Sequence, residues 1–160
     1  MKKVSLKTIR TIIILSFLTS CSVNDDANED SLIDIDYSSS QKIIDLVNNY
    51  RTENSLDILT YNETAKNLAV DHAQYMSEKG ELSIYNNEQR ESILKDKENA
   101  SIVLEFNARY YDASTLFEQW LNSPSTKRLL LGDYQRIGVG AVRDKNNKLY
   151  YTTIIFRIRD

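Results

Sequence analysis

Residues 137–142 read Ile-Gly-Val-Gly-Ala-Val and residues 149–158 read Leu-Tyr-Tyr-Thr-Thr-Ile-Ile-Phe-Arg-Ile, two stretches near the C-terminus that decide the fold. Both are rich in β-branched and aromatic side chains, which favour strands. The residues between them, 144–148, are Asp-Lys-Asn-Asn-Lys, and asparagine accepts the positive φ that a tight turn requires. The pattern therefore predicts a β-hairpin.

The second strand would be apolar on both faces. Alternation places Tyr150, Ile154, Phe156 and Ile158 on one face and Leu149, Tyr151 and Ile155 on the other. A sheet with two apolar faces needs helices on both sides to shield it from water.

A first helix is predicted near residue 40. Ser38 and Gln41 form a capping box, with Ser38 at the N-cap, and the helix would end near Asn54. Apolar side chains recur at helical spacing along one face, at Ile43, Ile44, Val47 and Tyr50.

Two further helices are predicted by the same kinds of signal. Asn62 can cap a helix that ends at Gly80, and Asp112 can cap one that ends at residues 123–124, Ser-Pro. The inner stripe of the Asn62 helix consists of Ala65, Leu68, Ala69, Ala73 and Met76, with His72 on the same side. Residues 81–112 are polar and weakly patterned, so we expect mostly loop with short helical turns there.

The predicted architecture is α+β, a three-layer α-β-α sandwich that ends in the hairpin. We expect a signal peptide over residues 1–20, a modified Cys21 and an acidic flexible tether over residues 21–38, and one folded domain over residues 39–160.

The N-terminus has the features of an export signal. Residues 1–20 contain four bases and no acid, and an apolar run at residues 12–18 is too short to span a bilayer. Residues 18–21, Leu-Thr-Ser-Cys, resemble the lipobox of bacterial lipoproteins, in which the cysteine becomes the first mature residue and carries the lipid. We therefore expect an exported lipoprotein held by Cys21 in the outer membrane, with display on the outer face as one option.

The charge of the mature chain argues against nucleic acid. The chain has a net charge of −3, and removal of the four bases in residues 1–20 leaves −7. Clustered Lys and Arg are needed to contact phosphates. The tether carries six acids and no base, so it is either a plain solvated spacer or a signal for outward display; the acids are Asp25, Asp26, Glu29, Asp30, Asp34 and Asp36.

The single Cys and single His exclude whole classes of site. One cysteine cannot form an internal disulfide or a cysteine-based zinc site, and one histidine cannot form a two-histidine metal site. We accordingly expect no metal and no cofactor.

Four patches resemble the CAP superfamily of cysteine-rich secretory, antigen 5 and pathogenesis-related domains, in its bacterial SCP-like form. They are residues 46–51 with 59–62, the small-residue helix at residues 65–76, Glu98-Asn99, and residues 120–140. Their order over residues 41–158 argues against a chance match. The resemblance implies an α-β-α sandwich with a surface cleft.

The resemblance also implies a cleft with two histidines and two acidic residues, which this chain has largely lost. Ile84 and Thr126 stand at the two histidine positions, Glu98 at one acidic position, and Ser123 near the other. Isoleucine and threonine can neither bind a borderline cation nor shuttle a proton near neutral pH.

The remaining candidate groups have structural interpretations. We expect His72 to be a packed histidine with a local hydrogen bond, and Glu98 to be a carboxylate held by backbone N–H groups, with Asn99 bracing the loop. The alternative roles are general base for His72 and general acid or base for Glu98.

We therefore expect a non-enzymatic, metal-free module, without catalytic residues, that binds a protein or small ligand at the cell surface as a monomer. A lipid or sterol carrier is the alternative, because Ile84 makes the former cleft more apolar. A hydrolase that uses His72 or Glu98 is the least favoured hypothesis.

Overall fold

The structure, a computed structural model of the chain, describes residues 33–159. The predicted signal peptide, Cys21 and the tether up to residue 32 lie outside the described residues. The elements are α1 (Tyr37–Glu53), β1 (Thr60–Tyr61), α2 (Glu63–Lys79), α3 (Asn87–Glu98), β2 (Ala100–Tyr110), α4 (Ala113–Asn122), α5 (Pro124–Leu130), β3 (Arg136–Arg143) and β4 (Leu149–Ile158). Among these residues, no helix combines the length and apolar character needed to cross a bilayer.

The predicted hairpin is confirmed. β3 and β4 pair antiparallel, with Gly140 opposite Thr152. In the turn between them, Asn147 has a φ of 64° and the Asp144 side chain accepts hydrogen bonds from the N–H groups of Asn146 and Lys148. The four strands lie in the order β1-β3-β4-β2, with β1 parallel to β3.

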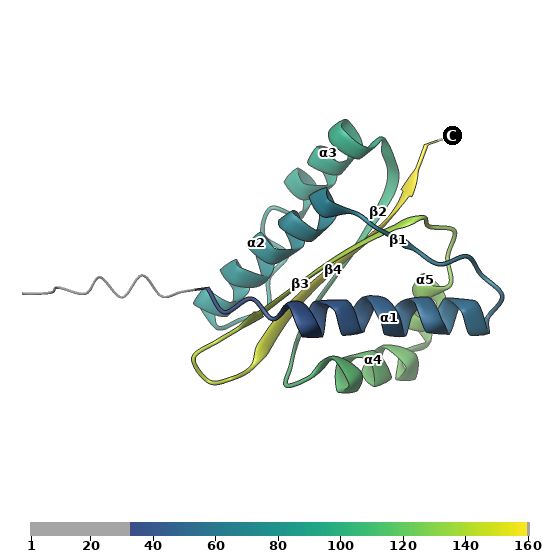
Figure 1. Cartoon of the computed structure of the whole chain (residues 1–160). Helices are drawn as coiled ribbons and strands as arrows, with labels where there is room; N and C mark the ends of the chain where they lie inside the picture. Colours follow the sequence, from purple (N-terminus) through teal and green to yellow (C-terminus); the bar gives the residue numbers. More distant parts are fainter. Residues whose placement is uncertain (1–32, 160) are drawn as a thin grey trace, which may run out of the picture. The chain divides into compact units, whose positions relative to one another are not determined.

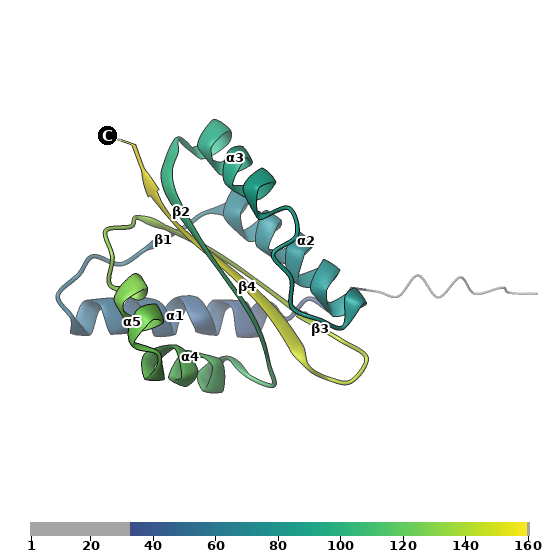
Figure 2. The same ribbon diagram turned by 180° about the vertical axis from the view of Figure 1, so that it is seen from behind.

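Helices cover both faces of this sheet, as the two apolar faces of the second strand predicted. Figures 1 and 2 show α2 and α3 on one face and α1, α4 and α5 on the other. Tyr151 and Ile155 belong to the core under α1 and α4, whereas Ile154 and Phe156 pack with Leu94 of α3 and the alanines of α2. The α+β, three-layer sandwich is therefore confirmed.

α2 lies with its backbone almost on β3. A Cβ atom added to Gly138 would come within 2.6 Å of the Ala65 methyl group, and one added to Gly140 within 2.5 Å of the Ala69 carbonyl oxygen. Only glycine on the strand and alanine on the helix permit this approach. The predicted ends of α2 are also confirmed, because Asn62 accepts from the Ala65 N–H and Gly80 adopts a φ of 73°.

The N-cap predicted for the first helix is wrong. Asp36, and not Ser38, caps α1, and its carboxylate accepts from the Ser39 N–H at 2.8 Å. Gln41 donates to Asp45 one turn further along the helix and closes no capping box. The sequence offers Asp36 and Ser38 as overlapping caps, and tertiary pairing chooses between them.

That pairing shows that the folded part begins before Ser39. Ile35 forms a β-bridge with Val142 at the edge of β3. The Asp36 N–H donates to the Ala141 carbonyl at 2.9 Å, and the Arg143 side chain pairs with Asp36. The last residues assigned to the tether are therefore part of the domain.

The expectation of a loop over residues 81–112 is also wrong, because this segment contains α3 and β2. α3 buries little apart from Leu94 and Arg90, so its apolar pattern is too sparse to indicate a helix. β2 is half-buried along most of its length and owes its extended conformation to pairing with β4.

The third predicted helix, α4, is confirmed with its Asp112 cap and its end before Ser123. A further short helix, α5, was not predicted from the sequence. Ser123, which ends α4, also caps α5, and Pro124 stands in the first turn of α5.

We expect Gly140→Ala to destabilise the domain by about 1–3 kcal/mol or more, because the new methyl group would meet the α2 backbone, which cannot rotate away. Urea unfolding measures the change. Gly132→Ala is the matched control, since the three atoms nearest to its methyl group all belong to the ring of Tyr134, a side chain that can rotate, and none to the backbone. Equal free energies of unfolding for the two variants would contradict the close contact between α2 and β3.

Candidate functional site

A buried polar cluster lies between α2, α3 and β2. At its centre, His72 of α2 is 3% exposed, and its Nε2 atom lies 2.8 Å from the Ser83 carbonyl oxygen and 3.8 Å from Oε1 of Glu105 on β2. A carbonyl oxygen only accepts, so Nε2 must carry the proton in this contact. Nδ1 is therefore the ring nitrogen that could accept a proton, and it belongs to a buried side chain.

Arg90 of α3 neutralises Glu105. Its Nε and Nη2 atoms each donate to one Glu105 oxygen at 2.7 Å, and Nη1 donates to the Tyr85 carbonyl at 2.8 Å. Asn107 of β2 donates to Glu105 at 2.8 Å and to the Ser83 carbonyl at 3.0 Å. The cluster therefore ties the α2–α3 loop to β2.

The electrostatics of the cluster favour a neutral imidazole. Burial lowers the pKa of His72, and the positive charge of Arg90 acts in the same direction against the opposing effects of the Ser83 carbonyl and Glu105. Burial alone would raise the pKa of Glu105, but the hydrogen bonds from Arg90 and Asn107 outweigh it and hold the pKa below its usual value. Glu105 is thus an ionised carboxylate already occupied by Arg90.

Aromatic rings continue outward from the cluster. The His72 ring stacks on Tyr75 with centroids 6.0 Å apart, and Tyr75 stacks on Tyr85 at 5.2 Å. This ladder joins α2 to the α2–α3 loop on the side where the loop passes over the cluster.

The four positions expected to form the cleft are spread over three places. Ile84 is 73% exposed on the α2–α3 loop, and Glu98 lies in the last turn of α3. Ser123 and Thr126 lie at the α4–α5 junction in the opposite helical layer, where Thr126 donates to Ser123 at 3.1 Å. The structure does not bring these side chains into one site.

Glu98 holds helix ends together. Its carboxylate accepts from Asn62 at 2.7 Å and from the Thr64 hydroxyl, so its partners are side chains at the start of α2 and not the backbone N–H groups that we expected. Asn99 ends α3 with a φ of 56°, and its carbonyl accepts from the Arg159 N–H.

Sequence reasoning missed Arg90, Glu105 and Asn107. Glu105 and Asn107 alternate with Leu104 and Phe106, a period of two that could have indicated a strand with polar side chains on one face. Nothing around Arg90 distinguishes it from the other charged residues of α3.

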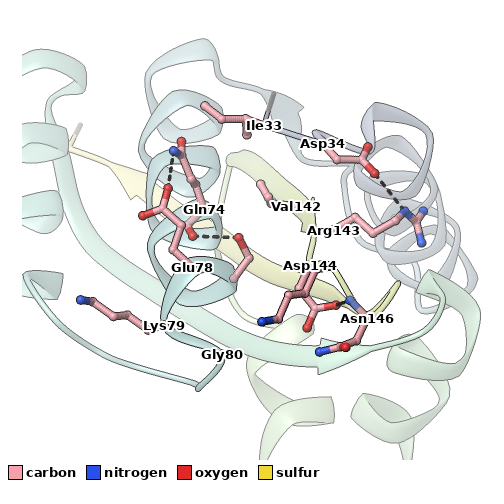
Figure 3. Close-up of a pocket in the computed structure, with 12 residues that line it drawn as sticks. Ile33, Asp34, Gln74, Glu78, Lys79, Gly80, Val142, Arg143, Asp144 and Asn146 are labelled. Atoms are coloured by element: carbon pink, nitrogen blue, oxygen red, sulfur yellow. Dashed lines mark hydrogen bonds and ion pairs between the residues drawn. The ribbon is translucent and has the colours of Figure 1, made fainter. Parts of the chain in front are cut away.

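A pocket of about 580 Å³ lies where α2, the hairpin turn and residues 33–34 meet. Figure 3 shows Gln74 and Glu78 on the α2 side, and Arg143 beside Asp34 on the other. The Gln74 amide donates to Glu78 at 2.7 Å, and Arg143 pairs with Asp34 at 3.6 Å, so each of these groups has a partner within the wall. None of the four expected cleft residues lines this pocket.

A second pocket of about 360 Å³ lies beside Arg51 of α1. The Arg51 guanidinium is buried and donates to the carbonyls of Asp57, Leu130 and Gly132 at 2.8–2.9 Å. These hydrogen bonds hold the segments that contain Asp57, Leu130 and Gly132 against α1. Among residues 33–159, no group of three or more His, Cys, Asp or Glu side chains could hold a metal ion.

The pKa of His72 is lower in the folded state than its ordinary value of 6.5 in the unfolded chain. As the pH falls below about 6.5, the unfolded chain therefore binds a proton that the native state does not bind. Stability contributed by neutral His72 is complete above that value and declines below it. We expect the wild type to lose up to about 1.4 kcal/mol more than His72→Gln between pH 7.5 and pH 5.5 in urea unfolding. Identical losses would show that His72 titrates normally.

The model of the CAP family, described as the cysteine-rich secretory protein family, matches residues 44–156. No curated protein is significantly similar to the chain in sequence.

Solved structures share the fold. An outer surface protein of Borrelia burgdorferi is 20% identical with a TM-score of 0.68, and the match covers 77% of this chain and 95% of that one. An extracellular protein containing an SCP domain from Bacillus anthracis is 25% identical with a TM-score of 0.63, covering 75% of this chain and 40% of that one. A cysteine-rich secretory protein from Staphylococcus aureus is 21% identical with a TM-score of 0.60, covering 75% and 38%.

This chain therefore spans less than half of the latter two proteins. The resemblance drawn from the four sequence patches is confirmed, because the family match extends over more than half of the chain. The chain belongs to the CAP, or cysteine-rich secretory protein, family.

Proposed function

We propose that this protein is an exported CAP module, anchored in the outer membrane through Cys21, that binds a protein or small ligand without metal or catalysis. Export is supported by the basic and apolar residues 1–20 and by the structural relatives described as an outer surface protein and an extracellular protein. Anchoring is supported by the position of the chain's single cysteine at the end of that segment.

The observation that carries the non-catalytic role is the state of the chain's only imidazole. His72 is buried, its Nε2–H is committed to the Ser83 carbonyl, and the nearest carboxylate, Glu105, is paired with Arg90. A general base must reach the proton that it removes from a substrate. The imidazole and carboxylate of this cluster instead hold α2, α3 and β2 together.

The larger of the two pockets described, about 580 Å³ between α2 and the hairpin turn, has a size usual for small-molecule sites. Its walls combine Lys79 and Lys145 with Glu78 and Asp144, and Ile33 and Val142 supply apolar area. A polar ligand that carries both donors and acceptors fits this lining.

We expect zinc to leave the thermal stability of the chain from Ser22 onward unchanged. A site of micromolar affinity would add about 2.7 kcal/mol at a hundredfold excess over its Kd, which corresponds to about 5–10 °C in Tm. Thermal unfolding with about 100 µM ZnCl2 or with EDTA measures the difference. The double variant Ile84→His, Thr126→His should also show no shift, because these positions lie in different helical layers. A rise of several degrees in the wild type would overturn the metal-free proposal.

Anchoring has its own test. In cells, we expect the wild type to partition into the detergent phase of Triton X-114 and Cys21→Ala to lose this partition, because the acyl chains supply the apolar area. Ser22→Ala is the neighbouring control and should behave as the wild type. Detergent partition of Cys21→Ala would show that another segment holds the protein in the membrane.

A further inference from the structure

β2 is the terminal strand of the sheet. It extends over eleven residues, Ala100–Tyr110, about twice the usual strand length, and it pairs only with β4 within the sheet of the described residues. Figure 2 shows β2 in front of the sheet, with α3 above it and α4 below it. An edge of this length presents a row of backbone donors and acceptors to another strand.

The hydrogen bonds at the opposite edge identify the outward groups of β2. The Ala141 carbonyl and the Arg143 N–H bond to residues 34–36, so odd-numbered residues of β3 point away from β4. Backbone groups alternate in direction along an antiparallel ladder. Even-numbered residues of β4 therefore bond to β3, and its odd-numbered residues bond to β2.

The register between β2 and β4 then shows which residues of β2 bond inward. Thr153 of β4 lies opposite Phe106, so even-numbered residues of β2 bond inward. The N–H and C=O groups of Val103, Glu105, Asn107 and Arg109 point outward. No hydrogen bond found among residues 33–159 beyond the β2–β4 ladder uses these backbone groups.

We propose that this edge pairs antiparallel with β2 of a second copy of the chain, which joins two sheets into one across a two-fold axis at Phe106. A bulge between Ala100 and Ile102 leaves residues 102–110 as the regular part of β2. Phe106 is its midpoint, so this register pairs the whole regular part and connects outward groups on both copies.

The side chains are self-complementary in this register. On the α1 and α4 face, Ile102 lies opposite the partner's Tyr110, Leu104 opposite the partner's Ala108, and Phe106 opposite itself, so every pair is apolar. Ile102 is 46% exposed in the single chain, and Leu104, Phe106 and Tyr110 are only half-buried. Pairing would cover them, and apolar cross-strand pairs stabilise sheets.

On the other face, Glu105 disfavours one of the two neighbouring registers. With the axis at Phe106, Glu105 lies opposite the partner's Asn107, so the two Glu105 carboxylates do not face each other. A shift of the axis to Glu105 would place two carboxylates directly opposite each other, which is destabilising. The proposal replaces the expectation of a monomer, and it depends neither on Cys21 nor on the pocket at the hairpin.

Sedimentation equilibrium of the chain from Ser22 onward, which retains every described residue, tests the interface. We expect the mass to rise from one copy to two between about 10 and about 500 µM, and Ile102→Lys to weaken dimerisation at least about tenfold. Ile58→Lys is the matched control, because Ile58 is 61% exposed in the loop between α1 and β1, away from β2.

Amide hydrogen exchange distinguishes strand pairing from another contact. The N–H groups of Glu105 and Asn107 should become protected as the wild-type concentration rises and stay unprotected in Ile102→Lys. A single-copy mass across the whole range would overturn the proposal. So would a dimer that both lysine variants weaken equally, or one that leaves these two amides unprotected.

Discussion

The close contact between α2 and β3 is the constraint on which the rest of the structure depends. Gly138 and Gly140 leave no room for side chains, so the Ala65 and Ala69 side of α2 rests directly on the strand. Because the helix is seated there, His72 is placed against Glu105 on β2, and the start of α2 meets Glu98. Two glycines thus position groups that lie far apart in the sequence.

The polar cluster on that helix is structural in its geometry. Arg90, Glu105 and Asn107 satisfy one another and the Ser83 carbonyl, and His72 is enclosed by them. Desolvation offsets much of the attraction in a buried charge pair, so the pair contributes little net stability. The cluster fixes the path of the α2–α3 loop, on which Ile84 is exposed.

Local chemistry explains which elements could be predicted. Some features can each be recognised from a few neighbouring residues in the sequence. They are the β3–β4 hairpin, the N-caps Asn62 and Asp112, and the helix end at Gly80. α3 could not be recognised in this way, because Leu94 is nearly alone on its helix, and the local signal for β2 was limited to the short alternation at residues 104–107. The choice of Asp36 over Ser38 likewise depended on a contact with β3.

The sequence by itself determined the family, the two apolar faces of the sheet and the absence of a second histidine or cysteine, since each depends only on residue identity and short-range order. The tertiary structure alone decided that Glu98 binds Asn62, that Arg90 occupies Glu105, and that Ile84 and Thr126 lie in different layers. The physical reason is that these partners lie 15 or more residues apart, so only the packing of the helices and the sheet brings them together. The sequence alone offers each polar side chain many partners of equal chemistry.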